Sequence, residues 1–525
     1  MNMTWEPEID EINRRRALAR EMGGTDRVAQ QHSLGKLTVR ERIEALVDPN
    51  SFLERGILGG VGTYDDDEKL TDFVPKSTVF GIGKVDNRPV SVTGQDFTAR
   101  PGSGSAGANG TTVTGGPRTI SAEHISHEMK IPFIRLIDGF GADIRAVGQK
   151  NRTYIPNGNW KLEHELLSEV PIVAAALGSV AGLPAAWVPA SHFSIMVKGK
   201  TQVFAAGPPV VKRAIGLDIH KEDLGGYQQH SRTSGVVNNE AEDELDALQQ
   251  IRRFLSYLPT NVWELPPLGD ESDPRDRKAH ELRSIIPRDR NRGYNPRQLI
   301  AFVMDKDSTF ELSRYFGGSQ ITMFARLNGR PVGILANDPM VHGGAQDASA
   351  ARKVEKFVDT CDTFHLPIIN FSDQPGFMIG PAAEAAGTLR AGVRTAVAIG
   401  QATVPWATVI VRRVYGVAGG ARQDNSHFNF QLAWPSGEWG SLPIEGGIAA
   451  AYRREIEAAE NPEEYRQQLE EKLISIRAPW RTAEDLDVED IIDPADTRPM
   501  LSDWLDVAYK ANERLVGPKS RGMRP

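Results

Sequence analysis

The sequence predicts an α/β protein made of two similar domains in tandem. Three segments recur in the same order: residues 85–96 as 326–338, residues 130–138 as 365–373, and residues 169–182 as 403–419. Matching positions are displaced by almost the same number of residues: 330 − 88 = 242, 367 − 132 = 235 and 405 − 171 = 234. An ordered repeat of this length indicates two homologous domains, and strands that alternate with helices indicate crossover connections. A site between two such halves can hold two different ligands, one from each half.

The composition is that of an ordinary folded protein, with 40% apolar and 25% charged residues in a chain of 525. The formal charge of −8 and the lack of a long basic tract indicate no nucleic-acid partner. The single cysteine, Cys361, excludes a disulfide framework and a cysteine-based zinc site, and its helical spacing from two phenylalanines predicts a buried structural thiol. No apolar run approaches ~18 residues and the N-terminus lacks a signal-peptide core. We therefore expect no membrane insertion and a cytoplasmic location.

The repeat places an N-terminal domain at residues 1–257, a linker at 258–290 and a C-terminal domain at 291–525. Residues 1–50 are expected to form two helices, since Ile43 and Leu46 recur in the second with a helical period. A further helix is expected at residues 122–129. Strands are expected where β-branched and other apolar residues cluster: 90–96, 133–139, 171–179 and 201–207.

The second copy repeats this order. Helices are expected at residues 297–305, 351–364 and 382–402, and strands at 332–338, 367–373 and 407–416. Residues 258–278 are rich in proline, aspartate and arginine without apolar periodicity, which is typical of a solvated connector. The charged, helical segment from residue 450 onward predicts a surface or assembly helix rather than a binding site.

Two turns rich in small residues, 177–187 and 412–423, follow buried strands in the two copies. Glycine and alanine at a strand end let the backbone approach a ligand closely. If a helix follows, its first N–H groups are unpaired and can point at an anion or a developing oxyanion. Each such donor can lower a barrier by ~2.7–4 kcal/mol. Tight strand–helix packing is the alternative for either turn alone, but matching positions in two repeats favour a functional interpretation.

A second pair of turns, at residues 138–148 and 373–380, also follows strands. In the later turn, Pro375 and Gly376 fix the chain direction, and Phe377 would supply an apolar wall. Alone, each segment is only a turn.

Residues 102–107 match the pattern G-x-G-x-x-G, but no helix follows and no βαβ unit of the required length is present. A dinucleotide-binding fold is therefore not expected. A mobile glycine-rich loop is the preferred interpretation. It could still close over a ligand, with Arg118 available for a phosphate.

Two residues could be mistaken for functional ones. Lys130 lies in a Met-Lys sequence like that of a biotin-attachment site, but it aligns with His365 at the end of a helix, so attachment is not expected. His192 could be a general base, although a satisfied core residue is favoured. No Ser–His–Asp set, G-x-S-x-G elbow or H-E-x-x-H motif is present. The ligands are thus expected to bring the reactive groups, while the protein orients them and stabilises oxyanions.

Segments along most of the chain point to one family: residues 35–54, 205–216, 222–236, 328–340, 373–380 and 491–505. Together they resemble the carboxyltransferase (β) subunit of biotin-dependent acyl-CoA carboxylases, the propionyl-CoA and methylcrotonyl-CoA carboxylase group. The resemblance implies two crotonase-like domains of the β-β-α superhelix type in a ring-shaped homohexamer. It also implies a partner that carries biotin carboxylase and biotin carrier domains. Acyl-CoA would bind along the N-terminal domain of one protomer, and carboxybiotin along the C-terminal domain of another.

The implied reaction forms one oxyanion on each ligand, so two backbone oxyanion holes are needed. Carried over from the family, the acyl-CoA hole falls at Gly182 and Leu183. The biotin hole falls at Val417 and Ala418. The other implied site residues are Tyr415, Gly416 and Gly419 for the biotin side, and Gly141, Ala142, Arg118, Gly376, Phe377 and Gly420 for the substrate. Biotin would be attached to the partner and not to this chain, and no metal is expected on it.

The departures from the family pattern are concentrated on the acyl-CoA side. Leu183–Pro184 stands where two glycines are usual, and proline has no N–H to donate. Asp143 stands where an arginine is usual, and Gly420 where an aspartate implicated in acyl choice is usual. We infer an unusual acyl group, either bulkier or more polar than propionyl.

Two alternatives stay open. One is the decarboxylase subunit of a biotin-dependent sodium pump, which uses similar chemistry in reverse with membrane partners. The other is a non-catalytic paralogue that fills a place in a carboxylase assembly, for which Leu183–Pro184 is the best support.

Overall fold

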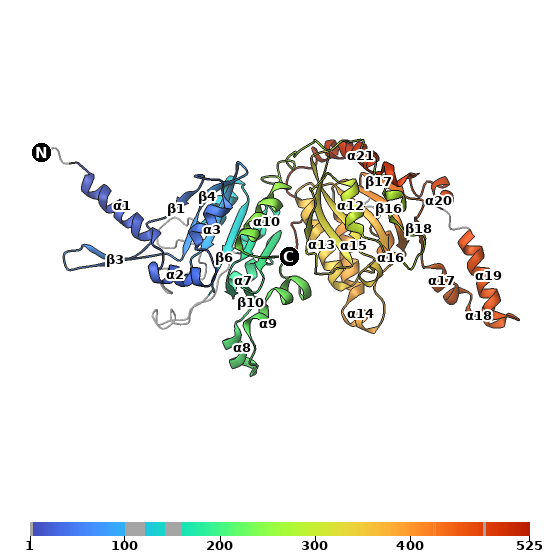
Figure 1. Cartoon of the computed structure of the whole chain (residues 1–525), viewed down its shortest axis with the longest axis horizontal. Coiled ribbons are helices and arrows are strands. Elements are labelled where there is room, and N and C mark those ends of the chain that lie inside the picture. Colours follow the sequence, from blue (N-terminus) through green and yellow to red (C-terminus); the bar gives the residue numbers. More distant parts are fainter. Residues whose placement is uncertain (1–3, 100–120, 142–159, 424, 426, 476–478) are drawn as a thin grey trace. The chain divides into compact units, whose positions relative to one another are not determined.

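The computed structural model describes residues 4–99, 121–141, 160–423, 425, 427–475 and 479–525. The chain forms two compact units: unit 1 is Met1–Glu264 with Ser520–Met523 and Pro525, and unit 2 is Leu265–Lys519 with Arg524. Each unit contains one large sheet flanked by helices, coloured blue to green in unit 1 and green to red in unit 2 (Figure 1). The predicted α/β class with two sheet domains is confirmed. The boundary between the units lies within the stretch predicted as a linker.

Unit 1 is built on a seven-stranded sheet. Its strands, in spatial order, are β1 (Leu53–Arg55), β4 (Thr78–Val85), β5 (Arg88–Gln95), β6 (Phe133–Ile137), β7 (Ile172–Ala176), β9 (Phe193–Val197) and β11 (Asn239–Ala241). β1, β4 and β5 are antiparallel neighbours, and the remaining pairs are parallel. β6, β7 and β9 are buried along their whole length, as expected of parallel strands covered on both faces. Two small sheets complete the unit: β2 (Gly60–Tyr64) with β3 (Leu70–Pro75), and β8 (Ser179–Ala181) with β10 (Gln202–Phe204).

Three helices, not the expected two, occupy the start of unit 1: α1 (Glu6–Arg20), α2 (Thr25–Ser33) and α3 (Val39–Leu46). Two glycines interrupt the first predicted helix. Gly24 has a φ of 89°, and a Cβ atom at Gly23 would lie 1.8 Å from the carbonyl oxygen of Thr98. α3 begins at a capping box formed by Thr38 and Glu41. The later helices are α4 (Ala122–Met129), α6 (Trp160–Glu169), α7 (Leu183–Trp187), α8 (Pro208–Ile215), α9 (Lys221–Gly225) and α10 (Glu244–Ser256).

Unit 2 repeats the strand order of unit 1. Its sheet runs β12 (Phe310–Leu312), β13 (Gln320–Leu327), β14 (Arg330–Asn337), β15 (Ile368–Gln374), β16 (Trp406–Tyr415), β17 (Asn429–Ala433) and β19 (Asp490–Ile491), with β18 (Glu438–Gly440) beside β16. Even the registers agree: Ser91 pairs with Phe133 and Phe133 with Ile172, while Gly333 pairs with Ile368 and Ile368 with Trp406. The displacements are 333 − 91 = 242, 368 − 133 = 235 and 406 − 172 = 234. They equal the displacements of the sequence repeat.

The helices of unit 2 are α11 (Leu282–Ile285), α12 (Pro296–Val303), α13 (Ala348–Thr363), α14 (Pro381–Ala385), α15 (Thr388–Gln401), α16 (Gly416–Gly420), α17 (Ile444–Ala451), α18 (Arg453–Ala458), α19 (Pro462–Ser475), α20 (Trp480–Glu484) and α21 (Thr497–Asn512). The single helix expected at 382–402 is split, because Gly387 adopts a left-handed conformation with φ 73° between α14 and α15. One hydrophobic core of the unit includes Leu299 of α12, Trp434 after β17 and Leu505 of α21.

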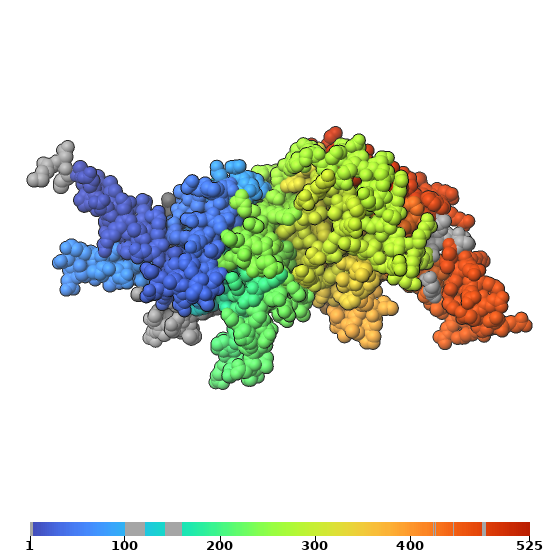
Figure 2. Space-filling model, viewed as in Figure 1, coloured from blue at the N-terminus to red at the C-terminus, as the bar shows by residue number. Residues whose placement is uncertain are grey.

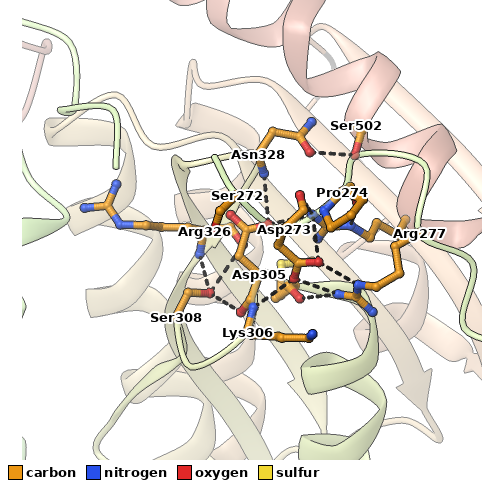
Figure 3. A network of polar contacts seen from close by, with 12 residues as sticks. Ser272, Asp273, Pro274, Arg277, Asp305, Lys306, Ser308, Arg326, Asn328 and Ser502 are labelled. Atoms are coloured by element: carbon orange, nitrogen blue, oxygen red, sulfur yellow. Dashed lines mark hydrogen bonds and ion pairs between the residues drawn. The ribbon is translucent and has the colours of Figure 1, made fainter. Parts of the chain in front are cut away.

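The predicted connector is part of unit 2 from Leu265 onward and is not simply solvated. Arg277 forms an ion pair with Asp273, with 2.8 Å between Nε and Oδ1, and donates to two carbonyl oxygens at the end of α12. The buried Arg498 of α21 donates to Asp305 at 2.7 Å. Figure 3 shows Asp273, Arg277 and Asp305 in one polar network. The ionic residues that suggested a solvated stretch therefore hold it against the unit.

One helix of unit 1 lies almost entirely on the surface. α8 has no buried residue, and its Val210 and Ile215 are exposed. Figure 2 shows this green segment as a projection from the surface of unit 1.

Candidate functional site

The turn predicted for the biotin side lies at the end of a buried strand. β16 ends at Tyr415, Gly416 follows with a φ of 62°, and α16 begins there. Val417 is 68% exposed, whereas Ala418 is 3% exposed. The first N–H groups of a helix have no partner within it. Among the described residues, none accepts a hydrogen bond from the N–H of Val417 or Ala418, so both donors are free for a ligand.

The carbonyl side of the same turn is firmly held. The N–H of Ala421 donates to the Val417 oxygen at 3.0 Å, and Gln423 Nε2 donates to the Gly419 oxygen at 2.7 Å. Thr408 Oγ1, near the start of β16, donates to the Gln423 oxygen at 2.8 Å. These bonds fix the direction of the turn and, with it, the direction of its free N–H groups.

The predicted residues Gly376 and Phe377 lie next to this turn. A Cβ atom at Gly376, whose φ is 124°, would be 3.9 Å from the Tyr415 carbonyl oxygen. The backbone of Gly376–Met378 forms a bridge with Gln346: Gln346 N–H donates to the Gly376 oxygen at 3.0 Å, and Met378 N–H donates back at 2.9 Å. The structure thus brings Gly376, Phe377 and the turn at Tyr415–Gly420 together at the carboxyl ends of β15 and β16.

No sequence motif predicted the buried ion-pair cluster beneath these turns. Asp373 is fully buried and lies 2.8 Å from Arg412 Nη2 and 2.6 Å from Arg413 Nε. Burial, together with the charge of Asp373, holds the pKa of the Tyr294 hydroxyl well above its usual range. The sequence did offer a signal for this cluster: two adjacent arginines begin the turn at 412–423, and an aspartate begins the turn at 373–380. The cluster joins the ends of β15 and β16, which carry the two turns.

The turn predicted for the acyl-CoA side differs in its free donors. Gly182 caps α7 with a φ of 71°, but its N–H already donates to the Phe204 oxygen of β10 at 3.2 Å. Pro184 has no N–H. Among the described residues, none accepts from the N–H of Leu183. Of the predicted pair, only Leu183 therefore offers a free donor in this structure.

Gly141 packs against this turn. Its N–H donates to the Ala181 oxygen at 3.1 Å, and a Cβ atom at Gly141 would lie 2.8 Å from Pro184 Cδ and 3.0 Å from the Leu183 nitrogen. The absence of a side chain thus allows this approach. Ala142 and Arg118 lie outside the described residues, as does the glycine-rich loop at 102–107.

Asp138, the residue in unit 1 that matches Asp373, is also buried among cations. Its Oδ2 lies 2.6 Å from Lys36 Nζ and 2.9 Å from Arg42 Nη1. Arg42 also pairs with the buried Glu244 at 2.7 Å. The carboxylate is thus held by residues from the N-terminal segment.

The structure agrees with the prediction that three other residues are structural rather than functional. His192 is buried, and its ring nitrogens bond the Ile172 N–H at 3.0 Å and the Leu167 oxygen at 3.1 Å. Lys130 ends α4 in a left-handed conformation and pairs with Glu169 at 2.6 Å. Cys361 is buried, and burial raises the pKa of its thiol well above the usual range, which argues against a nucleophile.

The described residues include no cluster of three or more histidine, cysteine, aspartate or glutamate side chains that could hold a metal ion. In the same ranges, none of the helices combines the length and the apolar character needed to span a bilayer.

Comparison with known proteins settles the family. A model of the carboxyl transferase domain matches residues 30–523. The chain belongs to this family. It is 34% identical over 504 residues to the propionyl-CoA carboxylase carboxyltransferase subunit of Haloferax mediterranei, with 95% of each chain covered.

Two further relatives of the carboxyl transferase chain bear on its chemistry. It is 31% identical over 529 residues to the methylmalonyl-CoA decarboxylase subunit alpha of Veillonella parvula, with 99% of each chain covered. A structure of transcarboxylase 12S, solved as a hexamer with methylmalonyl-CoA and methylmalonic acid bound, is 31% identical and covers 100% of this chain and 98% of its own. The TM-score of 0.85 confirms the predicted tandem crotonase-like fold.

Proposed function

We propose that this chain is the carboxyltransferase subunit of a biotin-dependent acyl-CoA carboxylase. It would move a carboxyl group from carboxybiotin to the α carbon, or the vinylogous carbon, of an acyl-CoA. The observation that carries the proposal is the family match over residues 30–523. The free N–H groups at matching turns of the two units support it.

On the biotin side, Val417 and Ala418 donate to the ureido oxygen. Carboxybiotin supplies the CO2 and, once it has lost it, the basic nitrogen that accepts the α-proton of the thioester. Gly416 and Gly419 allow the ureido group to approach the backbone closely, and Tyr415 ends the strand that positions the turn. Gly376, Phe377 and Gly420 line the same end of the sheet. The fit to a ureido group rests on the two unpartnered donors and the 68% exposure of Val417.

On the acyl-CoA side, Leu183 donates to the thioester oxygen while the α-proton leaves and the enolate forms. Gly182 supplies the left-handed backbone that directs this donor, and Gly141 leaves room beside it. Ala142 and Arg118 complete the proposed acyl-CoA contacts, with Arg118 assigned to a phosphate of the coenzyme. No metal is assigned to the reaction on this chain.

We further propose that the chain forms a homohexamer, like the transcarboxylase 12S structure, in the cytoplasm. Its partner would carry biotin carboxylase and biotin carrier domains. The acyl group is expected to differ from propionyl, since the departures Leu183–Pro184 and Gly420 both fall at the proposed site.

The decarboxylase direction is the second candidate, favoured by the relative from Veillonella parvula. The same donors would then stabilise the same oxyanions in the reverse order. A non-catalytic paralogue is the third possibility. The first two candidates differ in the direction of carboxyl transfer, and the third predicts no transfer.

The deciding experiment combines the purified chain with a biotinylated carrier and biotin carboxylase, and follows bicarbonate-dependent ATP use with a panel of acyl-CoAs. A carboxylase subunit should couple ATP hydrolysis to carboxylation of at least one acyl-CoA. A decarboxylase subunit should instead transfer the carboxyl group of methylmalonyl-CoA to biotin faster than the forward reaction runs. No transfer in either direction would overturn the enzymatic proposal in favour of the paralogue.

A further inference from the structure

Arg422, two residues after α16, is a buried cation that no anion among the described residues neutralises. Its side chain is 2% exposed. Among the described residues, no carboxylate lies within ion-pair distance of its guanidinium. Burial lowers the pKa of Arg422 to about 10, so the side chain keeps its charge at neutral pH. A buried charge without a partner destabilises a fold, which raises the question of what it does.

The guanidinium of Arg422 joins two strands of the unit 2 sheet. Nη1 donates to Gln320 Oε1 at the start of β13, and Nη2 donates to Asn370 Oδ1 of β15 at 3.3 Å. Nε is buried and has no hydrogen-bond partner. Two neutral amides thus hold the cation in place without cancelling its charge.

The backbone of Arg422 is tied to the proposed biotin turn. Its N–H donates to the Gly419 oxygen at 3.2 Å. Its carbonyl oxygen accepts a hydrogen bond from Asn370 Nδ2 at 3.0 Å. Asn370 therefore bonds both the side chain and the backbone of Arg422. Because the Arg422 N–H is bonded to Gly419, a shift of the arginine would also move Gly419 in the turn.

Unit 1 handles the equivalent position differently. Arg135 occupies the place of Asn370 (370 − 135 = 235) and is fully buried, but Glu163 neutralises it. The side chain that follows the unit 1 turn is Trp187, whose ring lies 5.2 Å from the Arg135 guanidinium. An uncompensated cation next to the turn is therefore a feature of unit 2.

We propose that Arg422 is a positioning residue for the biotin side: it fixes the end of α16 to β13 and β15, and it adds a positive charge that no described carboxylate neutralises to the interior next to the turn. The inference rests on the proposed function of that turn. The locked turn keeps the Val417 and Ala418 donors aligned, and the fixed charge favours the anionic ureido oxygen. Preorganised donors and charges of this kind stabilise an oxyanion without rearranging during the reaction.

The test measures transfer from methylmalonyl-CoA, or from the carboxylated form of the best acyl-CoA of the panel, to free biotin by the intact oligomer. Arg422→Met should lower kcat about 10-fold or more and leave KM for the acyl-CoA unchanged. Its thermal unfolding should be unchanged or shifted upward, because a buried unpaired charge is replaced by an apolar side chain. A merely structural residue would show the opposite pattern, with lost stability and a general loss of activity.

Arg422→Lys provides the second variant. It restores the charge only while the lysine is protonated, and burial lowers the pKa of Lys353, in the interior of the same unit, to about 7. Activity of Arg422→Lys should therefore approach the wild-type value near pH 6 and fall as the pH rises. The wild-type enzyme should not share this fall.

Lys353→Met is the matched control, because Lys353 donates to the Gln320 backbone oxygen at 2.7 Å without touching the turn. Its kcat should stay within about 2-fold of wild type. Wild-type kcat in Arg422→Met, or an equal loss in Lys353→Met, would overturn the inference alone. A wild-type chain without any transfer activity would overturn the proposed function and the inference with it.

Discussion

Units 1 and 2 share strand order and register but hold their matching buried aspartates in different ways. In unit 1, Asp138 is neutralised by Lys36 and Arg42, far away in sequence near the N-terminus. In unit 2, Asp373 is neutralised by Arg412 and Arg413 of the adjacent strand. The turn proposed for the biotin side therefore begins directly after its own cations, whereas the sheet end in unit 1 depends on an N-terminal segment that folds back onto it.

The two turns also differ in how many of their N–H groups are available to a ligand. In unit 1 the β8–β10 pair takes up the Gly182 N–H, and Pro184 removes another donor. In unit 2, the N–H groups of Val417 and Ala418 both lack an acceptor among the described residues. Since one donor can be worth ~2.7–4 kcal/mol, the two halves should stabilise the oxyanions of the proposed reaction unequally. The two units thus share strand order and register but differ in the N–H groups that their turns leave free.

The largest expected effect tests the long-range anchor of unit 1. Arg42→Ala removes the ion pair of the buried Glu244 and one of the two ion pairs of the buried Asp138, which keeps Lys36, and should destabilise the unit by ~3–5 kcal/mol, measured by denaturant unfolding. Arg275→Ala is the control, because this exposed arginine also pairs with two aspartates; it should cost ~0–1 kcal/mol. An equal loss of unfolding free energy in the two variants would contradict the special role of the buried Arg42 pairs.

The biotin-side donors come next. Ala418→Pro deletes one N–H in the first turn of a helix, where proline is tolerated, and should lower kcat about 100- to 1,000-fold while the oligomer still assembles. Ala418→Gly keeps the N–H and should retain most activity. Turnover near the wild-type rate in the proline variant would remove Ala418 from the site.

The buried cations of unit 2 should also give it a pH response. Burial lowers the pKa of Lys353 to about 7, whereas an unfolded lysine titrates near 10.4. Between these values the unfolded chain binds the extra proton, so the free energy of unfolding should rise with pH, by about 1.4 kcal/mol per unit at most. In denaturant titrations between pH 7 and 10, Lys353→Met should lose the part of this slope that Lys353 supplies. The part from Lys356, whose pKa burial lowers to about 8, should remain. Parallel curves for the two proteins would contradict the assignment.

The smallest expected effect sharpens the comparison of the turns. Pro184→Ala restores an N–H at the second position of α7 and should raise kcat/KM for the acyl-CoA about 3- to 10-fold, without changing KM for free biotin. Pro209→Ala, at the second position of the exposed helix α8, is the matched control and should have no effect. No gain in Pro184→Ala would mean that this N–H does not reach the thioester oxygen.

The repeat in the sequence predicted the frame well, because the displacements between matching residues carry the strand registers with them. It also located both turns, since glycines at the ends of apolar strands are visible locally. The occupied donor at Gly182 could not be predicted, because its acceptor, Phe204, comes from a later strand whose pairing only the fold determines. For the same reason the clusters around Asp373 and Arg422 were missed: their partners lie on other strands.

The parallel strand order of unit 2 also affects how a newly made chain reaches its native state. β14, β15 and β16 are neighbours in the sheet, yet long crossovers containing α13 and α15 separate them in sequence. Pairings so distant along the chain form slowly. The turn after β16 can take its final shape only when both crossovers have closed. Until then β14 presents an unpaired apolar edge, and association with other unfinished chains competes with folding.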